Sequence, residues 1–210
     1  YVVIFAIITF IASVTLLFTT MLFRKKIPDK LVSAFTNLGL FILAAGVWIV
    51  VDSRLLQFFT GHAPVIAMVS YLAMYLMPVF CLMFIKEMLS KYYPVLGYLA
   101  FGFEGLLILS VLIYKITGIP MYRLVYMEHA LLLVSIVFSL MYLIQELQLY
   151  QKALMRTLVK GIGLLFIFAF IAIVEFHIDH DSSYAVWFSL GILIFIAVTW
   201  RVGIASLFHR

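Results

Sequence analysis

The sequence predicts an all-α membrane protein, a bundle of seven transmembrane helices, and three observations support this fold class. Of the 210 residues, 67% are hydrophobic and 11% are charged, and the mean hydropathy is +1.23. Soluble domains are about 45–50% apolar and about 25% charged, so this chain has more apolar surface than a soluble core can hide. The apolar residues also form runs of about 20, the length of a bilayer-spanning helix. They do not alternate with polar residues as in a β-barrel.

Seven apolar runs define the predicted helices, and short polar loops separate them. The runs lie near residues 1–22, 32–52, 64–86, 95–114, 124–145, 158–178 and 184–206. Because the loops are short, we expect helices that are neighbours in sequence to pack antiparallel. Small residues in the second, fourth and sixth runs should let helices approach closely, and these are Gly39, Ala44, Ala45, Gly46, Gly102, Gly105, Gly161 and Gly163.

The loops between runs predict the orientation of the bundle. Eleven basic residues fall on one side of the predicted membrane, and they are Arg24, Lys25, Lys26, Lys30, Lys86, Lys91, Lys152, Arg156, Lys160, Arg201 and Arg210. Three fall on the other side, and they are Arg54, Lys115 and Arg123. Cytoplasmic loops carry the excess of Lys and Arg. The N-terminus is therefore expected outside and the C-terminus in the cytoplasm.

The ends of the chain and its single cysteine limit the function further. The chain begins at Tyr1 inside an apolar run and stops at Arg210 directly after another. We therefore expect one seven-helix domain, residues 1–210, that is a fragment of a longer protein. The lone Cys81 excludes an intrachain disulfide. The basic residues form no patch for nucleic acid, so the expected surroundings are the lipid bilayer.

Glu104 is the only charged residue near the middle of a predicted span. A charge there costs at least about 2.5–3.5 kcal/mol, and acids within the membrane are functional candidates for that reason. We expect Glu104 to face the bundle interior, to be protonated, or to pair with a neighbour such as Asn37. It is a candidate for ligand contact or for a proton-linked switch.

A second group of polar side chains lies at the predicted outer helix ends. It comprises Asp52, Arg54, His62, Glu128, His129, Glu175, His177, His180 and Asp181. His177 and His180 share a face if the sixth helix continues to residue 180, which suits two ligands of one zinc ion, and His129 or Glu128 could supply a third. The spacing matches no strong zinc signature. A metal site, a site for a small ligand, ion or proton, and a solvated turn all stay open.

Several segments resemble one family of membrane proteins. They are LGLFILAAGVWIVVDSRLLQFFTG (38–61), YLMPVFCLMFIKEM (75–88), His129, and LIQELQLYQKALMRTLVKGIGLL (143–165). The chain resembles the membrane region of clostridial-type GGDEF proteins, diguanylate cyclases whose seven-span segment is similar to the seven-transmembrane receptors with diverse intracellular signalling modules. The resemblance depends most on Trp48, Asp52 and Ser53, and on Pro78 with Lys86 and Glu87. It implies an extracytoplasmic input and a cytoplasmic enzyme after Arg210.

We therefore predict a sensory domain in the cytoplasmic membrane of a bacterium. An outer signal would shift the helices and act through the seventh helix on a GGDEF-type output domain that makes cyclic di-GMP. The catalytic activity would belong to that output domain, so no catalytic residue is expected in this chain. No cofactor is expected either, apart from the possible zinc ion at the outer histidines. A homodimer is compatible with such an output, although no residue in the sequence requires it.

Two other classes stay open. The outer histidines could serve a membrane-embedded metal hydrolase, with a metal-activated water and Glu128 or Glu175 as base. A small transporter or a scaffold is the other alternative, although no chain of charged residues runs through successive spans. The seventh run has no lysine before the chain end, which argues against a retinal Schiff base.

Overall fold

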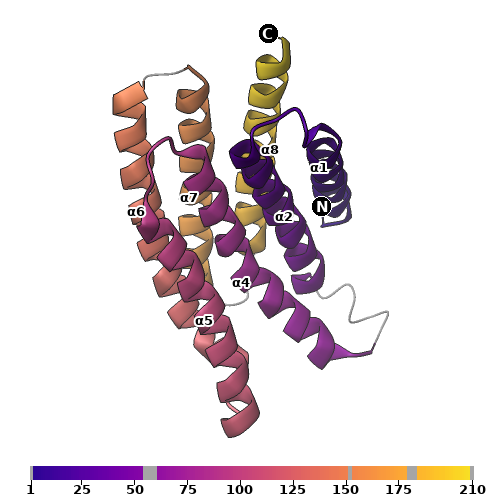
Figure 1. Ribbon diagram of the computed structural model, residues 1–210. Helices are drawn as coiled ribbons and strands as arrows, with labels where there is room; N and C mark the ends of the chain where they lie inside the picture. Colours follow the sequence, from indigo (N-terminus) through magenta and orange to yellow (C-terminus); the bar gives the residue numbers. More distant parts are fainter. Residues whose placement is uncertain (1, 54–60, 151–152, 179–183, 209–210) are drawn as a thin grey trace. The chain divides into compact units, whose positions relative to one another are not determined.

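The computed structural model describes residues 2–53, 61–150, 153–178 and 184–208 (Figure 1). These residues form seven α-helices and one short 3-10 helix, and none of them lies in a strand. The chain divides into two compact units, Tyr1–Ser139 and Leu140–Arg210, and the boundary between them falls within a helix.

The first unit holds four complete α-helices, one 3-10 helix and the beginning of a fifth α-helix. They are α1 (Val2–Phe23), α2 (Asp29–Asp52), α4 (Ala63–Met88), α5 (Pro94–Thr117), the 3-10 helix η1 (Met121–Leu124) and the first part of α6 (Val125–Tyr150). Helix α2 packs against both α1 and α4, and α4 packs against α5. Proline occupies the first turn of α4 and of α5, where its missing N–H is not needed. Gly118 ends α5 at φ 71°, a conformation that glycine adopts without steric cost.

The contact between α1 and α2 places small and polar side chains inside and apolar ones outside. Ser13 Oγ donates a hydrogen bond to the Gly39 carbonyl at 2.9 Å, and the space beside Gly46 is occupied by the Thr9 hydroxyl. The opposite side of α1 is apolar and open, with Ile4 at 66% exposure. This arrangement is typical of membrane helices, whose interfaces use small residues and hydrogen bonds while lipid covers the apolar side.

The second unit holds the end of α6, α7 (Ala153–Ile178) and α8 (Tyr184–Phe208). Helices α7 and α8 pack closely because each has a glycine where the other has a bulky side chain. A Cβ at Gly161 would lie 2.8 Å from Val198, and a Cβ at Gly191 would lie 2.7 Å from Phe168. The predicted role of Gly161 is confirmed, whereas Gly163 has open space beside it.

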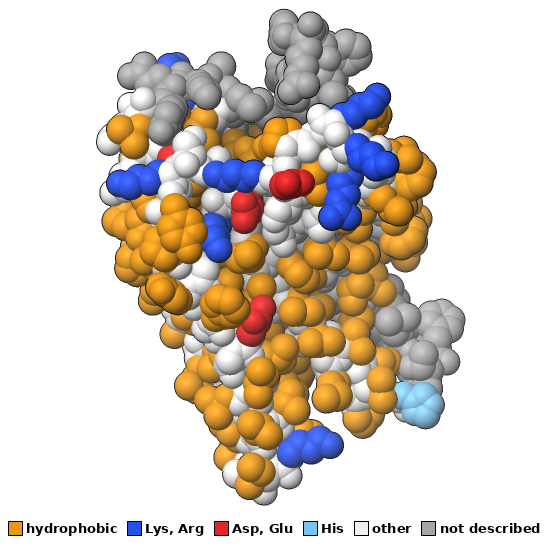
Figure 2. All heavy atoms as spheres, in the orientation of Figure 1, with side chains coloured by type: hydrophobic (Ala, Val, Ile, Leu, Met, Phe, Trp, Pro, Cys, Tyr) orange, Lys and Arg blue, Asp and Glu red, His pale blue; other side chains and the backbone are white. Residues whose placement is uncertain are grey.

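The structure confirms a multi-pass helical membrane protein. Each predicted run forms a helix, and six of these helices, α1 to α7 in chain order, are long and apolar enough to cross a membrane. In α8 the fully described part, Tyr184–Thr199, is apolar, and a seventh crossing stays a prediction. Hydrophobic side chains cover most of the face drawn in Figure 2.

One hydrogen bond bears on the predicted topology of the first unit. Lys30 Nζ at the start of α2 donates to the Leu89 carbonyl at the end of α4, at 2.6 Å. The α1–α2 and α4–α5 connections therefore lie at the same end of this unit. These are the two connections of the unit that the charge count assigns to the cytoplasm, while the direction of the whole chain across the membrane stays a prediction.

Candidate functional site

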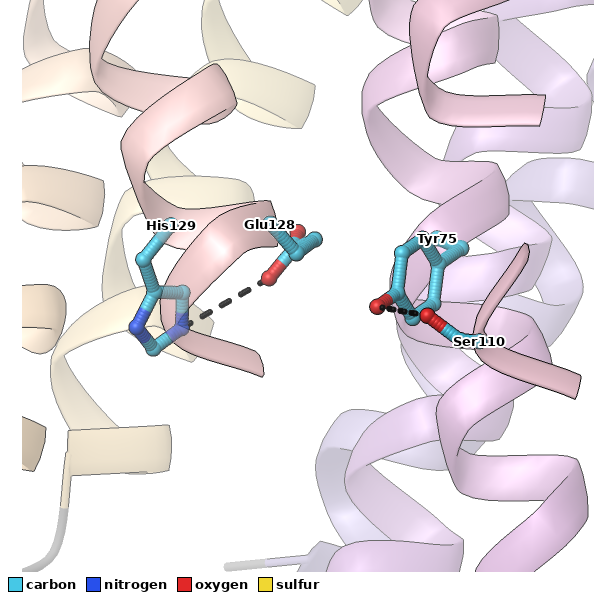
Figure 3. A network of polar contacts seen from close by, with 4 residues as sticks. All are labelled: Tyr75, Ser110, Glu128 and His129. Atoms are coloured by element: carbon cyan, nitrogen blue, oxygen red, sulfur yellow. Dashed lines mark hydrogen bonds and ion pairs between the residues drawn. The ribbon is translucent and has the colours of Figure 1, made fainter. Parts of the chain in front are cut away.

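Two pairs of polar side chains lie in the first unit (Figure 3). Tyr75 on α4 and Ser110 on α5 join their hydroxyl groups in a hydrogen bond of 3.1 Å. Glu128 and His129, neighbours near the start of α6, form the second pair. Tyr75, Ser110 and Glu128 are each 1% exposed, so three helices contribute a polar group to an apolar interior.

Glu128 is the least satisfied member of this set. Its Oε2 atom is buried and has no hydrogen-bond partner among the described residues. The nearest basic group is His129 Nε2 at 3.7 Å, which forms an ion pair only when the imidazole is protonated. The Glu128 carboxyl also interacts electrostatically with the Tyr75 phenol. A buried acceptor without a donor costs about 1–3 kcal/mol, and more when it is charged, so this arrangement is unfavourable unless a further group supplies a donor.

Helix α6 carries two further buried polar side chains on the same face as Glu128. Ser135 and Ser139 follow Glu128 at i+7 and i+11 and are 2% and 0% exposed. This spacing puts all three on one side of a helix. Ser135 Oγ donates to the Leu131 carbonyl at 2.8 Å, which satisfies it within its own helix. Ser139 Oγ is buried with no hydrogen-bond partner among the described residues.

Sequence reasoning missed four of the buried polar side chains described above, and these are Tyr75, Ser110, Ser135 and Ser139. The spacing of the two serines from Glu128 was a usable signal, because i, i+7 and i+11 share a helical face. Tyr75 and Ser110 carry no such signal. They lie 35 residues apart on different helices, and their contact depends on how α4 and α5 pack.

The arrangement can bind a hydrogen-bond donor or a small cation at the Glu128 carboxyl. It has an acceptor without a donor, a hydroxyl pair that can reorient, and an imidazole beside the carboxyl. Ser110 is not an activated nucleophile, because its described partner is a phenol and not a base. Chemistry on a covalent intermediate therefore has no support among these side chains.

Glu104 lies on the exposed side of α5 and does not face the interior. The buried side of α5 is formed by residues such as Ala100, Phe103 and Ser110, so the helix turns Glu104 outward. The suggested neighbour Asn37 instead donates its amide to the Ser33 carbonyl at 3.0 Å. The prediction that Glu104 contacts a ligand stays a prediction.

The remaining predicted site residues lie at helix ends. Asp52 is half-buried at the end of α2, and His62 is exposed just before α4. His177 is exposed near the end of α7 in the second unit, and His180 lies outside the described residues. In the described ranges no three His, Cys, Asp or Glu side chains gather as a metal site would need. The zinc site of His177, His180 and His129 stays a prediction.

Glu175, also predicted to lie on this outer rim, has a structural partner. Trp187 Nε1 on α8 donates a hydrogen bond to Glu175 Oε1 on α7 at 2.7 Å. Phe176 and Tyr184 meet edge to face, with ring centroids 5.3 Å apart. These contacts hold the ends of α7 and α8 together beside the connecting turn, so Glu175 stabilises the helix pair.

Comparison of the chain with known protein families, with curated proteins and with solved structures found no match. The six long apolar helices define the class as a multi-pass helical membrane protein. Its function is argued from the Glu128 site and from the sequence.

Proposed function

We propose that this chain is the sensory domain of a bacterial signalling protein in the cytoplasmic membrane. Its N-terminus is outside, α8 is the seventh crossing, and a cytoplasmic GGDEF-type domain follows residue 210. A small ligand, ion or proton that reaches the Glu128 carboxyl from the outer side is the input. The orientation derives from the charge of the loops, and the output domain derives from the family resemblance.

The buried Glu128 carboxyl is the observation that carries this proposal. A protein that only needed a stable bundle would do better with an apolar side chain there, because replacing buried charged groups by apolar ones is often neutral or stabilising. Ionisable groups kept inside a membrane protein at such a cost are functional candidates. Glu128 lies near the start of α6, the end that the loop charges place outside, where an external ligand arrives.

The relay follows from the length of α6. This helix runs without interruption from Val125 to Tyr150, so a rotation or shift at Glu128 moves the far end as well. A ligand changes the output only if it binds one arrangement of the helices more tightly than the other. A ligand that donates a hydrogen bond to Glu128 Oε2 stabilises the helix arrangement in which that atom is buried. The ligand therefore binds this arrangement more tightly than the alternative one.

The test measures cyclic di-GMP formed by the full-length protein in cells. Glu128→Gln keeps the shape of the side chain and replaces an acceptor oxygen by an amide donor. Allosteric couplings of 1–3 kcal/mol correspond to roughly 5- to 150-fold, so we expect Glu128→Gln to change the output at least about fivefold. Ser135→Ala is the matched control, because this buried serine on the same face bonds only its own helix in the described contacts. An unchanged output from folded Glu128→Gln, or the absence of any signalling domain after residue 210, contradicts the proposal.

The orientation is tested with a membrane-impermeant maleimide on intact cells. Lys26→Cys lies in the α1–α2 connection and Thr117→Cys lies at the end of α5, and both positions are exposed. A Cys81→Ala background removes the buried native thiol. We expect the Thr117→Cys protein to react in intact cells and the Lys26→Cys protein to react only after the membrane is opened. The reverse pattern would show that the N-terminus is inside.

A further inference from the structure

Glu104 lies at mid-length of a membrane-spanning helix, on a side that the described structure leaves exposed. Helix α5 spans Pro94–Thr117, and Glu104 is exposed on it together with Phe101 and Ile108, at 68% and 61%. A carboxylate facing lipid at this depth is energetically costly. This face of α5 is therefore unsuited to permanent contact with lipid while Glu104 is ionised, and a polar partner that covers it would remove this cost.

The chain itself offers no cation for Glu104 at its depth. Lys and Arg fall near the ends of the spans and in the connections, and none lies in the central part of any helix. Among the described residues of the first unit, therefore, no Lys or Arg lies at the depth of Glu104 to form an ion pair with it. Within copies of this chain, the partner is then a neutral hydrogen-bonding group or a second carboxyl.

A second copy of the chain supplies a carboxyl group at the depth of Glu104, namely its own Glu104. Copies inserted in the same direction hold Glu104 at the same depth, and a two-fold axis along the membrane normal brings the residue opposite itself. A carboxyl is its own complement, because its protonated form donates and its ionised form accepts. Gly105, next to Glu104, has nothing within 4 Å of a Cβ built there, so another helix can approach closely.

We propose that this chain forms a symmetric dimer through the exposed face of α5, with Glu104 of each copy hydrogen-bonded to Glu104 of the other. The face comprises Tyr98, Phe101, Glu104, Gly105 and Ile108. The dimer does not depend on the sensor function, and it would equally serve a transporter or a scaffold. It differs from the Glu128 site, which is buried inside one chain.

The experiment is disulfide crosslinking of the full-length protein in its native membrane, in the Cys81→Ala background. Gly105→Cys places a thiol on the proposed axis, and the open space around Gly105 accepts the side chain. Gly163→Cys on α7 is the matched control, because a Cβ at Gly163 also has nothing within 4 Å. We expect crosslinked dimers from the Gly105→Cys protein and none above background from the Gly163→Cys protein.

Substitution of Glu104 tests whether dimerisation depends on its carboxyl group or whether the two α5 helices are close for another reason. Glu104→Leu in the Gly105→Cys chain should lower the crosslinked fraction on the order of tenfold, since interhelical hydrogen bonds in membranes contribute up to about 1–2 kcal/mol. Glu104→Gln, whose amide also pairs with itself, should retain crosslinking. Equal crosslinking of the Gly105→Cys and Gly163→Cys proteins, or crosslinking unaffected by Glu104→Leu, overturns the proposal. If lipid, a different protein or the same chain covers Glu104, the Gly105→Cys and Gly163→Cys proteins should crosslink equally.

Discussion

Glu128 and Glu104 are both acids within apolar helices, and the structure places them in opposite environments. Glu128 is 1% exposed and lies beside His129 on α6 (Figure 3), whereas Glu104 is exposed on the outer side of α5. The buried acid has no hydrogen-bond donor for Oε2 among the described residues, and the exposed acid has no cation at its depth. Both arrangements are costly for an isolated chain, so each acid indicates something that the chain binds: a ligand inside, and a second copy outside.

Charge reversal should separate the two environments most strongly. Glu128→Lys places a longer, cationic side chain in a buried site, and we expect the free energy of unfolding to fall by about 3–5 kcal/mol. Glu104→Lys on the exposed face should change it by no more than about 0.5 kcal/mol in detergent. Thermal unfolding followed by gel filtration measures both. A Glu128→Lys protein as stable as the parent would mean that water already reaches this site.

The hydroxyl pair beside Glu128 should give a smaller, cooperative effect. Tyr75→Phe and Ser110→Ala each remove one partner of the 3.1 Å hydrogen bond between α4 and α5. We expect a coupling energy of about 0.6 kcal/mol, and at most about 1.7 kcal/mol, in a double-mutant cycle, the average and the maximum measured for such bonds in a membrane protein. Pairing Tyr75→Phe with Ser135→Ala is the control, because Ser135 bonds within α6. Equal coupling in both cycles would show that the substitutions act through general loosening of the bundle.

Substitution at the contact of a third acid, Glu175, should have the smallest effect on stability and output, because this carboxyl already has a hydrogen-bond partner within the chain. Its carboxyl accepts the Trp187 hydrogen bond between α7 and α8. Trp187→Phe should lower the free energy of unfolding by about 0.5–1.5 kcal/mol and leave the cyclic di-GMP output unchanged. Equilibrium unfolding and the cellular output assay together test this. An altered output would indicate that the input site lies near the Glu175–Trp187 contact and not at Glu128.

The sequence predicted the helices well because bilayer thickness sets their length. Each of the seven runs forms a helix close to its predicted bounds, and the polar segment 143–160 is helical wherever it is described. Prolines in the first turns of α4 and α5 and Gly118 after α5 mark three of the helix ends. The expected packing of sequential helices is found for α1 with α2, α2 with α4, α4 with α5, and α7 with α8.

The faces of the helices could not be predicted in the same way. A helix that is apolar all round has no polar side to reveal which face is inward. For this reason the depth of Glu104 was predictable and its direction was not. Glu128 was predicted at the outer rim, and its burial to 1% exposure was not predicted. The half-buried Asp52 and the exposed His62 and His177 agree with positions at helix ends, which the sequence did predict.

The most direct test of the different roles of Glu128 and Glu104 is labelling with a lipid-soluble carbodiimide, read by mass spectrometry of the peptides. This reagent modifies carboxyl groups that it can reach from the apolar phase. We predict labelling of Glu104 in monomers diluted in detergent, weaker labelling of Glu104 in the native membrane where the dimer covers it, and little labelling of Glu128 in either. Labelling of Glu128 as strong as that of Glu104 would contradict the account.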